Sequence, residues 1–345
     1  MRATLVFSFA AAAAIAIAQP TPDPPRGLTS VQGLKVGHHT LTERPTGCTV
    51  VIAEQGATAG VDVRGSAPGT RETDLLAPTA TVEAVHAIVL SGGSAFGLDA
   101  ASGVVKYLEQ RKIGFKYAGA IVPIVPAAIL FDLNVGDASI RPGADCGLAA
   151  AQAAGTGRIA EGNVGAGAGA TVGKMMGLER AMKGGLGTTA IVRPEGLVVA
   201  AMVAVNARGD VIDPSTGRVV AGMRSEDGKR LADVRAWLRS GLKPPLPEPM
   251  QNTTIGIVAT NAQLTKTQAT IVAQMAHDGI ARAVVPAHTP SDGDAVFALA
   301  TGAHKGAADV GLIGALAADA MAEAIVRAVR AATSIPGYPA ARDLR

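Results

Sequence analysis

The chain has few aromatic residues and almost no cysteine. Aromatic residues make up 3% of its 345 residues and only Cys48 and Cys146 are present, whereas 42 residues are glycine. A core must therefore be built from small aliphatic side chains with close backbone approaches. The two cysteines either pair in an oxidising compartment or stay as buried thiols, and both alternatives remain open.

Blocks of one charge and metal-ligand motifs are also absent from the sequence. The net charge is +3 with both signs spread along the chain, so no basic patch for nucleic acid is expected. The six histidines lack zinc-ligand spacing, so no metal is expected either.

The glycine-rich segment 162–173 gives only a weak cofactor signal. Gly165, Gly167 and Ala170 fit the loose dinucleotide pattern G-x-G-x-x-A, but no clear strand precedes them. We interpret these glycines as close backbone packing around Lys174 and expect no nucleotide or other cofactor.

The first residues have the features of a secretory signal. Arg2 supplies the positive charge, residues 5–17 the apolar stretch, and Ala16-Ile17-Ala18 a small-residue cleavage site. The apolar stretch is too short to favour a stable membrane span. Residues 1–18 therefore predict a cleaved signal peptide and a periplasmic or secreted protein.

The rest of the chain alternates strand and helix patterns irregularly. This irregular alternation favours a mixed α/β layered sandwich over a doubly wound sheet. Strand patterns cover 34–36, 48–52, 82–90, 196–206, 254–260, 283–285 and 296–301, and helix patterns cover 98–110, 225–241, 262–280 and 307–331. Ser94 falls in a strand-to-helix turn, where we expect it to cap the helix, because the G-x-S-x-G spacing of a nucleophile elbow is missed.

A hydroxyl residue stands where a proline-rich run, 243–249, gives way to a buried strand pattern. If the backbone is cut before Thr253, that residue gains a free amine beside its own hydroxyl, and the amine can act as the base of a nucleophile. The alternative is a strand with ordinary threonines. Asp292-Gly293-Asp294, taken alone, is typical of a turn, although two carboxylates there could also hold a hydroxyl and an ammonium group.

Together these segments resemble the P1-family peptidases, the group containing the D-aminopeptidase/esterase and the β-aminopeptidases. The threonine and the Asp-Gly-Asp are most similar to the endo-type nylon-oligomer (6-aminohexanoate-oligomer) hydrolase of that group. The resemblance spans about residues 27–331 and rests on 64–73 (RGSAPGTRET), 86–98 (HAIVLSGGSAFGL), 162–167 (GNVGAG), 182–187 (MKGGLG), 203–206 (VAVN) and the Asn252-Thr253 junction.

The resemblance implies a four-layer αββα sandwich similar to N-terminal-nucleophile hydrolases, with different connectivity. It implies one catalytic domain, residues 27–331, cut after Asn252 into a large subunit, 19–252, and a small subunit, 253–345. Cleaved protomers are expected to form a tetramer that hydrolyses small peptides or oligoamides.

Site residues are carried over from the family position by position. Thr253 is the implied nucleophile, Asn206 the oxyanion donor, Lys174 the nearby positive group, and Asp292 and Asp294 the orienting carboxylates.

Two substrate-pocket positions depart from the family pattern. Phe131 replaces a family tyrosine, and Ala127 replaces the glutamate that grips a substrate amine, a loss for which Asp132 is a candidate substitute. The alternative hypothesis is therefore a binding or assembly protein that keeps the fold without processing.

Overall fold

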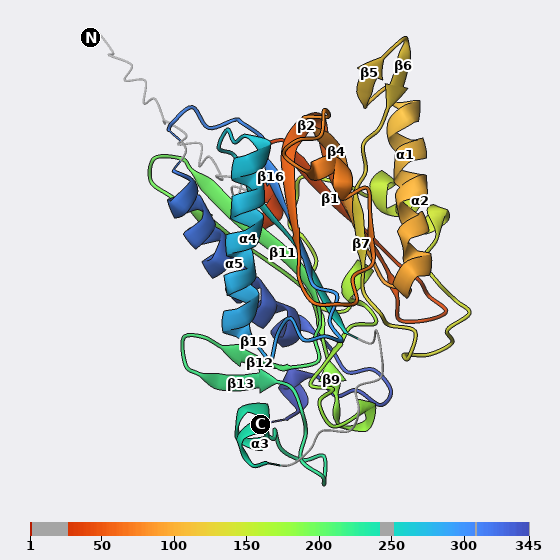
Figure 1. The fold of residues 1–345 in the computed structure, drawn as a ribbon, viewed down its shortest axis with the longest axis vertical. Coiled ribbons are helices and arrows are strands. Elements are labelled where there is room, and N and C mark those ends of the chain that lie inside the picture. Colours follow the sequence, from red (N-terminus) through yellow and green to blue (C-terminus); the bar gives the residue numbers. More distant parts are fainter. Residues whose placement is uncertain (2–26, 242–251, 308, 345) are drawn as a thin grey trace.

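A single mixed sheet bends back on itself to form two layers (Figure 1). The computed structural model describes residue 1 and residues 27–241, 252–307 and 309–344, so most of the predicted signal peptide and the proline-rich run 243–249 lie outside the described residues. The strand order is β10-β11-β14-β16-β2-β4-β7-β3, with β1 beside β2. The bounds are β1 Leu34–Thr40, β2 Gly47–Val63, β3 Thr70–Arg71, β4 Val85–Ser91, β7 Ala127–Ile129, β10 Gly185–Val192, β11 Val198–Asn206, β14 Thr253–Thr260 and β16 Ala295–Ala300.

Strand β2 joins the two layers. Its first half pairs with β1 and β4, its second half pairs with β16, and its register against β4 shifts between Ile52 and Ala57. Such irregularities let one strand turn from one packed layer into the next.

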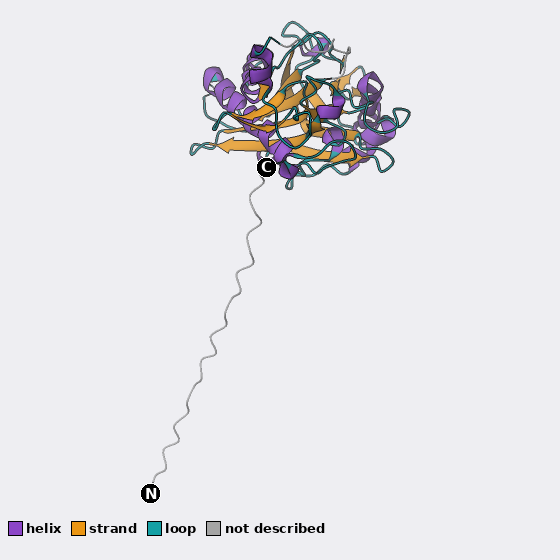
Figure 2. Ribbon diagram, turned by 90° about the horizontal axis from the view of Figure 1, so that it is seen from below, coloured by secondary structure: helices purple, strands orange, loops and turns teal. Residues whose placement is uncertain are grey.

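Helices cover both outer faces of the folded sheet, as Figures 1 and 2 show. On one side α4 (Lys266–Ala283) and α5 (Val310–Ala331) pack on β2, β10, β11 and β16, and on the other α1 (Ala100–Gln110) and α2 (Ala144–Gln152) pack on the layer of β1, β2 and β4. Separate hydrophobic clusters fill the three spaces between the layers. The predicted αββα sandwich is therefore confirmed.

Shorter elements lie outside the main sheet and the four long helices. They are β5 Phe115–Tyr117, β6 Ala120–Val122, β8 Thr171–Val172, β9 Met182–Lys183, β12 Asp210–Asp213, β13 Arg218–Ala221, β15 Val284–Val285, α3 Val234–Arg239 and the 3-10 turns η1 Leu28–Ser30, η2 Asp74–Leu76, η3 Ser94–Asp99, η4 Gly165–Gly167, η5 Leu178–Arg180 and η6 Ala341–Asp343.

The central strands alternate strictly between two cores. In β11, Val199, Ala201 and Val203 face the α4/α5 side, whereas Ala200 and Met202 face the space between the sheet layers. Because side chains alternate with period two, the last residue of β11, position 206, faces the space between the layers as well.

Two local predictions were wrong. The expected helix 225–241 is helical only in α3, because a turn around Gly228 precedes it and Asp233 caps it by accepting the N–H of Arg235. Ser94 does lie in the strand-to-helix turn, but its side chain makes no capping hydrogen bond and its φ is +54°.

The long helix patterns near the C-terminus are confirmed. Helix α4 begins after Thr265, which forms a capping box with Gln268. Helix α5 continues unbroken through Gly311 and Gly314.

The two cysteines are bonded to each other. The disulfide joins Cys48 in β2 to Cys146 in α2 and so ties a helix to the sheet layer beneath it. Of the two alternatives left open by the sequence, the structure shows the paired one. Among the described residues, no helix combines the length and apolarity needed to cross a membrane.

Glycines set the closest helix contact. A Cβ at Gly147 of α2 would lie 1.8 Å from the carbonyl oxygen of Ala100, and one at Gly103 of α1 would lie 1.8 Å from that of Ala144. Helices α1 and α2 therefore approach each other through backbone surfaces that leave no room for a methyl group.

We expect Gly147→Ala to destabilise the fold by about 1–3 kcal/mol, because the added methyl group must push the two helices apart. Gly157→Ala is the matched control, since a Cβ there meets nothing within 4 Å. Thermal unfolding of both variants checks this, and equal melting temperatures would contradict the packing argument.

Candidate active site

The pairing of β11 with β14 places Thr253 directly opposite Asn206. Thr253 begins β14 and is buried, and alternation along both strands turns these two side chains towards the space between the sheet layers. The Thr253 hydroxyl donates a hydrogen bond to the carbonyl oxygen of Asn252. In the uncleaved chain the nitrogen of Thr253 is a peptide amide, so it is not yet a base.

The side-chain amide of Asn206 has a fixed orientation. Its Oδ1 accepts from Lys174 Nζ at 2.8 Å and from the backbone N–H of Thr171 at 3.0 Å, and its Nδ2 donates to the carbonyl of Phe131 at 2.8 Å. Because an ammonium group and an N–H can only donate, the amide oxygen must face them. The amide nitrogen is thereby held on the opposite side.

Lys174 is a buried cation behind Asn206. Its Nζ also donates to the backbone carbonyl of Asn206 at 3.0 Å. Burial lowers the pKa of Lys174 to about 7, although the charges of Asp292 and Asp132 act in the opposite direction. Near neutral pH a large fraction of Lys174 is therefore unprotonated and able to accept a proton.

The two carboxylates of the Asp-Gly-Asp segment lie at the entrance to β16, which runs parallel to β14. Asp294 Oδ1 accepts the N–H of Thr254 at 2.6 Å, and its Oδ2 lies 2.7 Å from Nδ1 of His288. Asp292 Oδ2 accepts from the N–H and the hydroxyl of Thr289, at 2.7 and 2.6 Å. Asp294 therefore fixes the start of β14, beside the nucleophile candidate.

Burial makes the charged form of Asp292 unfavourable. Burial and the neighbouring Asp294 raise the pKa of Asp292 to about 6, against the hydrogen bonds from Thr289 and the charge of Lys174. It is ionised at neutral pH only at the expense of desolvation.

The carbonyl that precedes Thr253 is held from the other side by Gly293. The Gly293 N–H donates to the Asn252 oxygen at 3.2 Å, and Asn252 forms an isolated parallel bridge with Asp292. The Asn252–Thr253 bond is thus buried, polarised and next to a hydroxyl.

His288 was missed by sequence reasoning. It bonds to Asp294, and its ring meets that of His277 edge-on at 4.8 Å between centroids. The only signal in the sequence is its position six residues before Asp294. His277 comes from α4, so the contact exists only in the folded chain.

The three predicted substrate-pocket residues, Phe131, Asp132 and Ala127, lie in different surroundings. Phe131 reaches the site through its backbone carbonyl. Asp132, in contrast, is fully buried in an ion pair with Arg44 at 2.7 Å and accepts from Thr46 at 2.6 Å, and Ala127 is buried in the core beneath α1 and α2. The side chain of Asp132 is therefore held by Arg44 and Thr46, although its charge still acts on Lys174, and the side chain of Ala127 is part of the core.

The glycine-rich segment packs around Lys183 rather than Lys174. Lys183 Nζ donates to the carbonyls of Gly167 and Ala170, each at 2.9 Å, and to that of Gly184 at 3.2 Å. A Cβ at Gly167 would lie 2.3 Å from the nitrogen of Leu186. Converging carbonyls suit a cation and not a phosphate, which agrees with the packing interpretation but corrects its centre.

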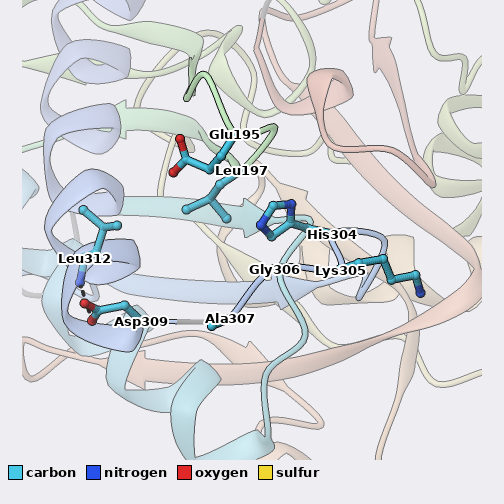
Figure 3. A pocket seen from close by; sticks show the side chains of 8 residues that line it. All are labelled: Glu195, Leu197, His304, Lys305, Gly306, Ala307, Asp309 and Leu312. Atoms are coloured by element: carbon cyan, nitrogen blue, oxygen red, sulfur yellow. Dashed lines mark hydrogen bonds between the residues drawn. The ribbon is translucent and has the colours of Figure 1, made fainter.

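A cavity of about 400 Å³ lies at the far end of the sheet (Figure 3). It is lined by the turn between β10 and β11, by residues after β16 and by the start of α5, whereas Thr253 is at the opposite end of β14. Its acidic groups serve the fold, since Asp309 caps α5 through the N–H of Leu312 and Glu195 pairs with Arg193. The described residues that line it include no serine, threonine or cysteine. Within the described part of the chain, no three acidic, histidine or cysteine side chains are grouped to hold a metal ion.

Comparisons with known proteins identify relatives of this chain. The model of peptidase family S58 matches residues 27–342. An uncharacterized aminopeptidase of Mycobacterium leprae is 42% identical over 92% of this chain and 93% of its own length. A 6-aminohexanoate-oligomer endohydrolase of a Kocuria species is 30% identical over 86% of this chain and 84% of its own.

Solved structures show the same architecture. A β-aminopeptidase of a Burkholderia species superposes with a TM-score of 0.66 at 25% identity, over 93% of this chain and 91% of its own. An L-aminopeptidase D-Ala-esterase/amidase of Ochrobactrum anthropi, described as a variant of the Ntn-hydrolase fold, has a TM-score of 0.65 at 20% identity over 93% and 91%, a likeness that concerns the fold alone.

The raised pKa of Asp292 predicts how the stability of the fold depends on pH. Its folded pKa, about 6, lies above the usual 3.8, so its favourable contribution is complete below pH 3.8 and is lost as pH rises through 6. Asp292→Asn, whose amide oxygen can keep both bonds from Thr289, is expected to be about 1–3 kcal/mol more stable than wild type at pH 8, with no difference near pH 3.5. Melting temperatures across this range test it, with the exposed Asp319→Asn as control. A pH-independent difference would argue against a desolvated charge.

Proposed function

This chain belongs to peptidase family S58 and is a hydrolase that acts on amide bonds, and on that premise we propose that its first substrate is its own backbone between Asn252 and Thr253. The observation that carries the proposal is the contact of the Thr253 hydroxyl with the carbonyl that precedes it, whose oxygen also accepts the Gly293 N–H. Cleavage would leave a large subunit, 19–252, and a small subunit, 253–345, together forming one catalytic domain over residues 27–331.

Self-processing would proceed as an N–O acyl shift. Thr253 Oγ1 attacks the Asn252 carbonyl carbon while the Gly293 N–H stabilises the oxyanion. The amine of Thr253 is not available at this stage, so Lys174, partly neutral near pH 7, is the candidate base for the hydroxyl proton. The C–N bond breaks as its nitrogen is protonated, and water hydrolyses the resulting ester. One water is consumed, and the carboxylate of Asn252 and the amine of Thr253 are released.

Turnover would use the same hydroxyl with a new base. The freed amine of Thr253 accepts the Oγ1 proton as the oxygen attacks a substrate amide or ester carbonyl, and hydrolysis of the acyl-enzyme by water completes the cycle. We assign Nδ2 of Asn206, whose orientation is fixed by the bonds to Oδ1, to the substrate oxyanion. Asp292 lies where it can balance the new ammonium charge, while Asp294 holds the N–H of Thr254.

For the substrate, we propose small oligoamides, including 6-aminohexanoate oligomers, cut internally. Support comes from the similarity to the Kocuria endohydrolase and from the engagement of Asp132 by Arg44, which leaves that carboxylate unavailable to grip a substrate amine.

Aminopeptidase activity is the second candidate, favoured by the higher identity to the Mycobacterium leprae aminopeptidase. Blocking the amino group of an oligomer separates the two, since an aminopeptidase requires that group to be free. The alternative of a non-catalytic binding protein is disfavoured by the complete cluster around Thr253.

Export and assembly complete the proposal. The buried Cys48–Cys146 disulfide supports a periplasmic or secreted location, because such bonds persist in oxidising compartments. The signal peptide, residues 1–18, lies almost wholly outside the described residues. The tetramer of processed protomers rests on the family resemblance alone.

Intact mass and N-terminal sequencing of wild type and Thr253→Ala test the processing step. We expect the wild type to give a fragment that starts Thr-Thr-Ile-Gly and a large fragment that starts at residue 19, and the variant to stay whole because it lacks the attacking oxygen. Thr254→Ala is the matched control, since its neighbouring hydroxyl takes no part. A wild-type chain that stays whole would refute the terminal-threonine mechanism.

Replacing Asn206 is expected to affect turnover more than processing. Asn206→Ala should lower kcat of the processed enzyme about 10²–10³-fold, because one oxyanion donor is removed. Processing should slow far less, since Gly293 serves the Asn252 carbonyl. Single-turnover and steady-state rates with a chromogenic anilide measure this, with Asn163→Ala as the control. An equal loss in both reactions would show that Asn206 does not discriminate between the two oxyanions.

A further inference from the structure

Arg208 is a buried residue whose guanidinium forms no ion pair with a carboxylate of the described residues. It follows β11, and 9% of the residue is exposed. Within the described part of the chain its guanidinium makes one hydrogen bond, from Nη1 to the hydroxyl of Ser291 at 3.3 Å. A guanidinium has five N–H donors, so further donors of Arg208 are available to a ligand.

Ser291 connects this cation to the bond that we propose is cut. The Ser291 hydroxyl also accepts from Nδ2 of Asn252 at 3.3 Å and lies 3.1 Å from the hydroxyl of Thr289. Asn252 is 4% exposed, and its Oδ1 has no hydrogen-bond partner among the described residues. Among the described residues, the Oδ1 of Asn252, which has no partner, and the Arg208 guanidinium are therefore linked through one hydroxyl group, that of Ser291.

The position of Asn252 marks the acyl side of the site. Any acyl donor attacked by Thr253 must place its carbonyl carbon beside Oγ1, as the carbonyl of Asn252 is placed now, because the position of the nucleophile is fixed. The side chain on that donor then falls where the Asn252 side chain lies, against Ser291 and Arg208.

We propose that Arg208 and Ser291 form a specificity subsite for an acyl group that bears a short carboxylate or carboxamide, as in aspartyl and asparaginyl donors. This inference rests on the proposed function and names a substrate class for it. A carboxylate of that length meets the Arg208 guanidinium with charge-assisted bonds, and a carboxamide can use its oxygen for Arg208 and its nitrogen for Ser291. Cleavage also adds the Thr253 ammonium group, a further cation beside Asp292 and Asp294.

The first test uses the processed wild-type enzyme with p-nitroanilides of aspartate, asparagine, alanine and leucine, each with a free and with an acetylated amino group so that either mode of cleavage is detected. We expect kcat/KM for the aspartyl and asparaginyl compounds to exceed that for the leucyl compound by about tenfold or more, the range for a hydrogen bond to a charged group. Arg208→Gln should remove most of the aspartyl preference, with a much smaller fall for the alanyl compound. The exposed Arg282→Gln is the matched control. A wild type that prefers leucine, or an equal fall for all four compounds, would overturn the subsite.

The second test needs no added substrate, because the chain presents its own acyl group. We expect Asn252→Leu to lengthen the half-time of processing about tenfold or more and Asn252→Asp to change it far less. In the Arg208→Gln background the difference between the two should shrink. Denaturing gels over time give the rates.

The two proposals fail differently in this experiment. A wild-type chain that stays whole refutes processing and the subsite together. A wild type that is processed at the same rate as Asn252→Leu refutes the subsite alone.

Discussion

The site depends above all on the pairing of β11 with β14 in the middle of the sheet. That register sets Asn206 across from Thr253, and alternation turns both side chains into the space between the layers. A slip of β14 by one residue would turn Thr253 into the opposite core and away from Asn206. The parallel neighbour β16 then brings Asp292 and Asp294 to the same end. The strand order and register therefore bring the candidate site residues to the same end of the sheet.

Burial gives these groups their reactivity. Removed from water, Lys174 has a pKa of about 7 and Asp292 a pKa of about 6, so both can exchange protons near neutrality. Hydrogen bonds offset part of this desolvation: Lys174 donates to Asn206, and Asp292 accepts from Thr289. Arg208 is also buried, and its guanidinium forms no ion pair with a carboxylate of the described residues.

Much of this was predictable from local sequence. The β-branched run after Thr253 predicts a buried strand, and the structure shows one. The resemblance to the family named Lys174, Asn206 and the two aspartates, which lie far apart in the chain. In the structure Lys174 bonds to Asn206, Asn206 lies opposite Thr253, and Asp294 accepts the N–H of Thr254. Asp132 and Ala127 were assigned to a substrate pocket by alignment alone. The structure places Asp132 in an ion pair with Arg44 and Ala127 in the core under α1.

The sequence by itself determined the elements, the small-residue core and the position of the candidate scissile bond, because these follow from local propensity and from motifs of adjacent residues. Only the tertiary structure decided that the two cysteines are bonded, that Lys183 and not Lys174 centres the glycine packing, and that His288 supports Asp294. It also left Arg208 without an ion pair to any carboxylate of the described residues. Each of these outcomes depends on which groups from distant parts of the chain come into contact when the layers pack together. A local sequence pattern carries no information about such contacts.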